Sequence, residues 1–348
     1  MKLSRIFKTW EFALFILLIV EIVVLGIINP IFLNFDNLLY ATLDFSHILF
    51  AALPLTLVII TAGIDISSVS VMGLVSIVLG LVWVAGINVF LAMFIAILVG
   101  MLAGAFNGVF TANTDVNPLV ITLGSLFMFA GFAQGLPVLL DKLNFKIYGS
   151  GGLAAYQYEG ITGLPDSFIN LAGGSLGSVP YPIIFVLLFA AVLAVLLHKT
   201  RFGRYLYQIG VNMDAAKYSG VPVKKTLIIT YIISGFGAAI AGIMLTSYFT
   251  SARADLGADA LLPIITAVVL GGADILGGRG TILGTLLAGL VLGYLHQGLL
   301  AIGVSSDVIQ VVIGAVLIAS MAIRALINNI SQRVQNKKTL SKRKEANI

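Results

Sequence analysis

Long runs of apolar residues, separated by short polar interruptions, dominate the chain. An α-helix rises about 1.5 Å per residue, so a run of roughly 20 apolar residues can cross a hydrocarbon core of about 30 Å. The pattern predicts an all-α polytopic membrane protein with about ten transmembrane helices in a single domain over residues 1–348. The predicted segments are Phe12–Ile28, Ile48–Gly63, Val69–Ala85, Val89–Thr111, Leu119–Leu140, Pro182–His198, Leu227–Phe249, Leu261–Gly271, Ile282–Ile302 and Val308–Ile327.

The second and eighth segments are short and end in polar, glycine-rich breaks. The two breaks share a pattern, because Leu-Pro at 53–54 precedes Gly-Ile-Asp-Ile at 63–66, and Leu-Pro at 262–263 precedes Gly-Ala-Asp-Ile at 272–275. Internal repeats around a central path are common in transporters. We therefore expect a weak internal repeat, which is either direct or contains one re-entrant segment. Residues 35–47, before the first short segment, are expected to form an interfacial helix or part of a mouth.

Positive charge predicts the orientation of the chain, because Lys and Arg concentrate in cytoplasmic loops. Residues 1–10, 199–225 and 324–348 hold three, six and seven of the 20 Lys and Arg residues. Both termini and the middle loop are therefore expected in the cytoplasm, with six spans before this loop and four after it. Residues 141–180 then face outward, and residues 328–348 form a basic cytoplasmic tail.

Composition excludes several other classes of protein. Hydrophobic residues make up 59% of the chain and charged residues 10%, against about 45–50% and 25% in soluble domains. So few charges cannot cover a soluble protein of this size. The chain has no cysteine, which excludes a disulfide framework and a thiol nucleophile. The basic residues lie in a few short patches, so no nucleic-acid partner is expected.

The motifs that would support catalysis are missing from the sequence. The three histidines do not form His-Glu-x-x-His, and no Gly-x-x-x-x-Gly-Lys-Ser/Thr phosphate loop is present. We therefore expect no catalytic residue, no metal and no cofactor in this chain.

Polar residues inside the apolar segments are the first group of candidate site residues. Such groups are costly in a bilayer, so they face protein or a water-filled cavity. Asp65 and Asp274 lie at the two breaks, where they either line a path or cap the following helix. Repeated carboxylates are missing, which favours a path for an uncharged polyol over one for an ion. The candidate path residues are Asp65, Ser67, Asn107, Asn117, Thr122, Gln134, Asp274 and Gln297, although hydrogen bonding between helices would explain any one of them.

Residues 199–225 carry the strongest local signal. Asn212 can cap a short helix that has Asp214 in its first turn, and Gly220 and Pro222 can end it. Adjacent alanines at 215 and 216 would give this helix a small, uncharged face suited to another protein's cleft, although a plain loop helix has the same spacing. The candidate coupling residues are Gly210, Asn212, Asp214, Ala215, Ala216, Ser219 and Gly220.

Several of these stretches resemble a known family. Asp-Ala-Ala at 214–216 with Gly220 resembles the Glu-Ala-Ala…Gly loop of ABC-importer permeases, whose short coupling helix inserts into a groove of the ATPase subunit. Residues 57–67, 117–124 and 269–280 resemble the ribose, xylose and galactoside branch of these permeases. Residues 158–165, 197–200 and 247–258 are similar to the D subunit of Lsr-type autoinducer-2 importers.

The resemblance implies a permease subunit that translocates autoinducer-2, a small furanosyl polyol, or alternatively ribose or another monosaccharide. It implies a multi-pass protein of the bacterial inner membrane. It also implies as partners a second homologous permease, two ATPase subunits that bind ATP and Mg, and an extracytoplasmic solute-binding protein. ATP binding would then favour one of two states of an alternating path. An ion-coupled secondary transporter or channel that acts alone is the alternative from another class.

Overall fold

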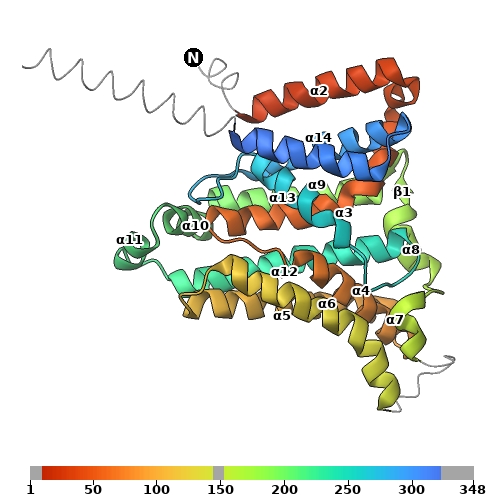
Figure 1. Ribbon diagram of the computed structural model, residues 1–348, viewed down its shortest axis with the longest axis horizontal. Coiled ribbons are helices and arrows are strands. Elements are labelled where there is room, and N and C mark those ends of the chain that lie inside the picture. The colour runs from red at the N-terminus through yellow and green to blue at the C-terminus, as the bar shows by residue number, and fades with distance from the viewer. Residues whose placement is uncertain (1–9, 144–152, 323–348) are drawn as a thin grey trace, which may run out of the picture.

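The computed structural model describes residues 10–143 and 153–322, which form a bundle of helices (Figure 1). The helices lie roughly along one direction, with α11 at one end of the bundle and α7, α8 and a short hairpin at the other. The elements are α2 (Trp10–Ile28), η1 (Pro30–Leu33), α3 (Phe35–Ile60), α4 (Ser68–Val84), α5 (Val89–Asn113), α6 (Pro118–Lys142), η2 (Leu153–Ala155), α7 (Tyr156–Glu159), α8 (Asp166–Gly173), β1 (Ser175–Leu176), β2 (Val179–Pro180), α9 (Tyr181–Lys199), α10 (Arg201–Val211), α11 (Met213–Tyr218), α12 (Val223–Tyr248), η3 (Ala258–Ala260), α13 (Leu261–Leu270), α14 (Ile282–Ala301) and a last helix over Ser306–Ala322.

The predicted apolar segments all coincide with helices in the described part of the chain. Seven helices there are long and apolar enough to cross a membrane, namely α2, α3, α5, α6, α9, α12 and α14. Three apolar helices are shorter, over Ser68–Val84, Ala258–Leu270 and Ser306–Ala322. The prediction of an all-α polytopic membrane protein is confirmed. The predicted basic tail at 328–348 lies outside the described residues.

Residues 35–47 do not form a separate interfacial helix, because they are the first half of α3. Their place in a mouth stays a prediction. Asn34 caps the helix, accepting a hydrogen bond from the Asp36 backbone N–H over 2.9 Å. The hydroxyls of Thr42 and Ser46 donate to carbonyls three residues earlier, so polar side chains are satisfied without interrupting the helix. The same residues lower the local hydropathy, which is why the continuous apolar run in the sequence begins only at Ile48. The helix α3 therefore has 26 residues rather than the short length expected.

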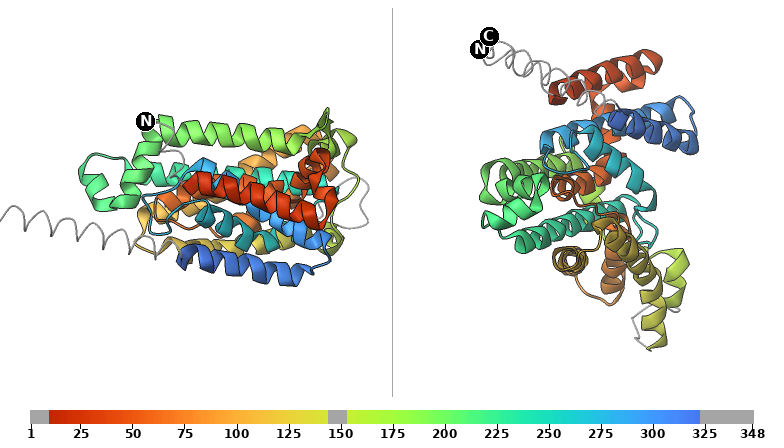
Figure 2. Two further views of the ribbon diagram at one scale, coloured as in Figure 1. Left: turned by 90° about the horizontal axis from the view of Figure 1, so that it is seen from above. Right: turned by 60° about the vertical axis from the view of Figure 1, so that its left-hand side comes forward.

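The interior of the bundle consists of α3, α4 and α12. We compared the most apolar stretch of 18 residues in each long helix. In α3, 78% of the residues in this stretch are buried, and in α12, 67%. In α2 and in α6 the buried share is only 22%. A helix that is apolar on all sides is suited to such a position. Figure 2 shows α2 and α14 on one side of this interior and α5 and α6 on the other.

Glycines allow α5 and α12 to pack closely. Gly100, Gly104 and Gly108 are spaced four residues apart on one face of α5. A Cβ atom on Gly104 would lie 2.2 Å from the carbonyl oxygen of Tyr231, and one on Gly235 would lie 2.2 Å from that of Gly100. Small residues at this spacing are typical of helix contacts inside membranes, where close backbone packing replaces the hydrophobic driving force.

Candidate functional site

The segment 199–225 folds into two helices, α10 and α11, at one end of the bundle (Figure 1). Asn212 separates them, and its Oδ1 atom accepts a hydrogen bond from the Ala215 backbone N–H over 2.8 Å. Asp214 lies in the first turn of α11. Gly220 follows the helix with φ +80°, a conformation that favours glycine. The predicted short, capped helix is therefore confirmed.

The two alanines of α11 differ in burial. Successive residues of an α-helix point about 100° apart, and here Ala216 is buried beside Ile209 and Leu227 whereas Ala215 is exposed. Both alanines line a shallow groove of about 340 Å³, together with Gln208 and Ser219. The small, uncharged face for a partner therefore stays a prediction, and Ala215 is the more exposed of its two alanines.

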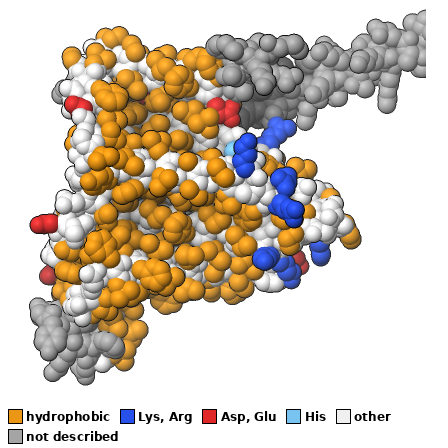
Figure 3. Space-filling view, turned by 180° about the vertical axis from the view of Figure 1, so that it is seen from behind, with side chains coloured by type: hydrophobic (Ala, Val, Ile, Leu, Met, Phe, Trp, Pro, Cys, Tyr) orange, Lys and Arg blue, Asp and Glu red, His pale blue; other side chains and the backbone are white. Residues whose placement is uncertain are grey.

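The end of the bundle around α11 combines exposed apolar side chains with positive charge. Tyr218 is 91% exposed, Val211 75% and Met213 45%. Figure 3 shows Lys and Arg gathered at this end, whereas hydrophobic side chains cover most of the visible surface elsewhere. The described basic residues near this end are Lys199, Arg201, Arg204, Lys217, Lys224, Lys225 and Arg279. Large apolar side chains on a surface that is also charged are typical of a protein-binding face.

The helix α10 contacts both breaks in the apolar segments. We name residues 60–67, from the last residue of α3 to the residue before α4, the first break, and residues 271–281, between α13 and α14, the second break. A Cβ atom on Gly210 would lie 1.8 Å from the carbonyl oxygen of Ile60 and 2.4 Å from the backbone nitrogen of Gly278. The Tyr207 hydroxyl donates to the carbonyl oxygen of Gly280 over 2.7 Å, and burial raises the pKa of this phenol.

The two breaks also bond directly to each other. The Gly278 backbone N–H donates to the carbonyl oxygen of Ile60 over 2.8 Å. The breaks therefore lie at the same end of the bundle. The segment that carries α11 touches both, so a displacement of α11 has a direct route to each break.

A buried polar cluster surrounds the first break. Asp65 is 2% exposed. Its Oδ1 atom accepts hydrogen bonds from the backbone N–H and the hydroxyl of Ser67 over 3.1 and 2.7 Å, and its Oδ2 atom accepts one from the Ser234 hydroxyl over 2.7 Å. Asn107 Nδ2 donates to the Ser67 hydroxyl over 2.7 Å. The Thr122 hydroxyl donates to the carbonyl oxygen of Ile64 over 3.1 Å.

This cluster brings together Asp65, Ser67, Asn107 and Thr122 from the candidate path residues. Its hydrogen bonds join the first break to α5, α6 and α12 around one carboxylate, which is costly to bury unless it is satisfied in this way. Ser234 is not among the candidate path residues. Ser234 could have been selected by the criterion that selected Asn107, because it is a polar residue within an apolar segment of the sequence.

The other candidate path residues lie elsewhere. Asn117 is exposed and caps α6, and Gln134 is exposed on the same helix. Asp274 accepts from the Leu276 backbone N–H within the second break, whereas Thr281 caps α14, so the capping alternative is wrong for Asp274. Gln297 lines a separate groove between η1, α3 and α14. Their place on a path stays a prediction.

The fold is that of a helical membrane protein with charged and apolar side chains exposed together at one end. A family model described as the permease component of branched-chain amino acid transport systems matches residues 37–321, and the chain belongs to this family. It is therefore a membrane transport component rather than an enzyme.

Its relatives are more specific. The chain is 44% identical over 335 residues to the autoinducer 2 import system permease protein LsrD of Photorhabdus temperata, covering 94% of this chain and 97% of the relative. It is 44% identical over 322 residues to the proteins of that name from Escherichia coli strain K12 and Shigella flexneri, covering 92% of this chain and 94% of each relative. The resemblance to Lsr-type autoinducer-2 importers is thus confirmed. No solved structure matches the chain.

Proposed function

We propose that this chain is a membrane-spanning subunit of an ATP-driven importer that moves autoinducer-2 into the cell across the bacterial inner membrane. The observation that carries the proposal is the 44% identity to autoinducer-2 import permeases over more than nine-tenths of the chain. The exposed face of α11 supports the same proposal, because it supplies a surface on which a separate ATPase can act.

The importer in this proposal contains several subunits. The chain pairs with a second, homologous permease, and each permease receives one ATPase subunit at its α11. ATP and Mg bind only to the ATPases, and a solute-binding protein delivers the ligand at the opposite end. All ten apolar helices take part in the membrane domain, with both termini in the cytoplasm, and the two breaks form a weak internal repeat.

Measurements of uptake in cells test which ligand is transported. Cells that lack the gene should leave autoinducer-2 in the medium, and cells that carry it on a plasmid should remove it. Ribose uptake measured in the same pair of strains separates the two ligands. Ribose uptake that depends on the gene, with no effect on autoinducer-2, would contradict the proposal.

The Ala215→Trp variant tests coupling to the ATPase. Ala215 is exposed, so a large side chain there should leave the stability of the permease unchanged, but it should block docking because the groove beside α11 is shallow. We expect loss of co-purification with the ATPase and at least a tenfold loss of uptake, equivalent to about 1.4 kcal/mol or more.

The matched control for this variant is Leu176→Trp on β1, an exposed position at the opposite end of the bundle. It adds the same side chain far from α11, so co-purification with the ATPase should be unchanged. Normal co-purification of Ala215→Trp would contradict the docking role.

A further inference from the structure

A pocket of about 330 Å³ lies at the end of the bundle opposite α11. We name it the distal pocket. Its walls come from α3, the last turn of α12, the loop 249–260, α14 and the helix Ser306–Ala322. Its volume falls within the range of about 300–1,000 Å³ typical of small-molecule sites. From Asp44 in this pocket to Ile60 at the start of the first break, α3 rises about 24 Å.

Polar side chains from separate elements meet in the distal pocket. Asp44 and His47 come from α3, Tyr248 from α12 and His296 from α14. The Tyr248 hydroxyl donates to the Asp44 carboxylate. A carboxylate accepts hydrogen bonds, a phenol does both, and a neutral imidazole donates from one nitrogen and accepts at the other. A ligand with several hydroxyl groups, each a donor and an acceptor, matches this mixed set.

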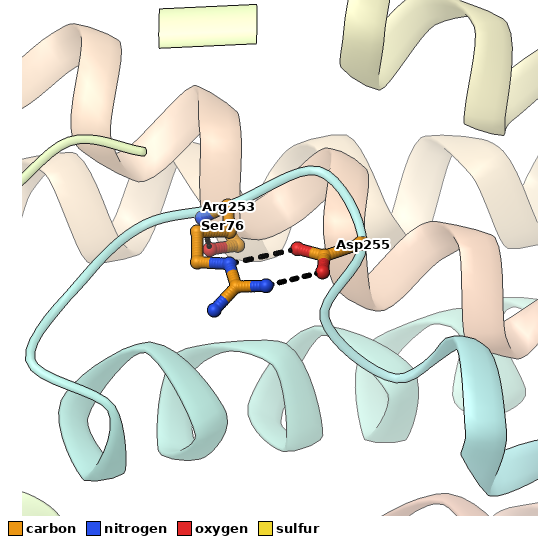
Figure 4. Close-up of polar contacts among 3 residues, drawn as sticks. All are labelled: Ser76, Arg253 and Asp255. Carbon is orange, nitrogen blue, oxygen red and sulfur yellow. Dashed lines mark hydrogen bonds and ion pairs between the residues drawn. The ribbon is translucent and has the colours of Figure 1, made fainter. Parts of the chain in front are cut away.

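The charges of the pocket disfavour an anion. Arg253, on the loop 249–260, forms an ion pair with Asp255 (Figure 4). The Nε atom of Arg253 donates to Asp255 Oδ1 over 2.9 Å. The guanidinium is thus already matched by a carboxylate, while Asp44 and Asp259 add further negative charge. A neutral ligand avoids the repulsion that a phosphate group would meet here.

The loop that forms one wall is held in place by α4. The Arg253 backbone N–H donates to the Ser76 hydroxyl over 3.0 Å, as Figure 4 shows. A Cβ atom on Gly73, one turn earlier in α4, would lie 2.1 Å from the carbonyl oxygen of Ala254. The loop therefore packs directly on the helix backbone, which keeps the pocket walls in a fixed arrangement.

Aromatic rings contribute to the apolar part of the pocket, beside aliphatic side chains. Phe45 and Phe249 both line it. Phe45 packs edge-on against Tyr294 with ring centroids 5.3 Å apart, and Phe249 against Tyr248 with centroids 5.2 Å apart. The C–H faces of a small ring can rest on such surfaces while its hydroxyl groups reach the polar side chains.

We propose that the distal pocket binds a small, neutral, hydroxyl-rich ligand and is the entry site of this subunit. This inference rests on the proposed function, because it names where that transporter first holds its cargo. The residues that bind the ligand are Asp44, His47, Tyr248 and His296.

Protection of a single thiol tests the pocket. The chain has no cysteine, so the Ala258→Cys variant places one thiol at an exposed position of the pocket lining. The transporter complex, in lipid nanodiscs and without its binding protein, is treated with a small maleimide, and modification of this chain is followed by mass spectrometry. Autoinducer-2 or ribose should slow modification by about tenfold at roughly ten times its Kd.

Matched variants separate the pocket from the surrounding surface. Leu176→Cys lies at the same end but outside the pocket, so neither ligand should protect it. Adding Asp44→Asn to Ala258→Cys should weaken protection, whereas adding Asp36→Asn, an exposed carboxylate on the same helix, should not. If neither ligand slows the modification of Ala258→Cys, the proposed binding site is wrong, even if cells import autoinducer-2.

Two further outcomes are informative. Ribose 5-phosphate should protect less than ribose, and equal or stronger protection would overturn the assignment to a neutral ligand. Protection by ribose alone, in cells that do not import autoinducer-2, would support the pocket and contradict the proposed function.

Discussion

At the scale of single residues, Gly210 has a highly restricted position in the segment 199–225. It lies at the end of α10, where a side chain of any size would strike the carbonyl oxygen of Ile60 and the backbone of Gly278. Backbone atoms cannot move aside as a flexible side chain can. Glycine is therefore required here by close approach and not by backbone conformation.

The Gly210→Ala variant should separate α10 from the two breaks. We expect a loss of about 1–3 kcal/mol in stability, as for overpacking in a core, together with reduced uptake. The matched control is Gly131→Ala on α6, because a Cβ atom at Gly131 has open space around it. Thermal unfolding in detergent and uptake in cells measure both effects. Behaviour of Gly210→Ala equal to that of Gly131→Ala would contradict the proposed contact.

At the scale of elements, α4 links the interior to the loop 249–260. Gly73, Ser76 and Gly80 are spaced three and four residues apart, so they lie on one face of this helix. A Cβ atom on Gly80 would lie 2.7 Å from the Ala252 side chain. The Ser76 hydroxyl accepts from the Arg253 backbone N–H and also bonds the Thr246 hydroxyl over 2.7 Å.

The Ser76→Ala variant should loosen this loop. Removing the hydroxyl leaves a partly buried backbone donor without its acceptor, which costs about 1–3 kcal/mol. We expect faster hydrogen exchange of the amides at 251–257, measured by mass spectrometry. Ser70→Ala on the same helix is the control, because the Ser70 hydroxyl bonds only the carbonyl oxygen of Ser67 among the contacts described. Equal exchange in the two variants would contradict the role of Ser76.

At the scale of the whole molecule, the two ends of the bundle differ in charge and in chemistry. One end carries α11, both breaks and most of the described basic residues (Figure 3). The other carries the hairpin β1–β2, the distal pocket and the Arg253–Asp255 ion pair. The excess of Lys and Arg at the α11 end predicts that this end faces the cytoplasm.

Thiol accessibility in spheroplasts tests this orientation. Tyr218→Cys on α11 and Leu176→Cys on β1 place single thiols at opposite, exposed ends of a chain without cysteine. A membrane-impermeant maleimide should modify Leu176→Cys in intact spheroplasts and Tyr218→Cys only after lysis. Modification of Tyr218→Cys before lysis would place α11 outside the cell and contradict its coupling role.

The sequence was sufficient for the features that depend on local chemistry. Apolar runs predicted the helices, because a segment that crosses lipid must satisfy its backbone internally. The capping of α11 by Asn212 could also be predicted, because capping is a local interaction. The capping residue and its partner Ala215 are only three residues apart. The extent of α3 was not predicted. Its Thr42 and Ser46 hydroxyls bond carbonyls of the same helix, but in the sequence these polar residues cannot be distinguished from a break between two helices.

The amino-acid sequence was enough to predict the class of protein, the helical segments, the charge asymmetry and the short helix at 213–218. It could not show that Ala216 is buried while Ala215 is exposed, that Gly210 touches both breaks, or that Asp44, Tyr248 and His296 meet in one pocket. The difference lies in the distance along the chain between the residues involved. Helix formation and capping depend on neighbours within four residues, whereas the pocket and the breaks join segments that lie hundreds of residues apart.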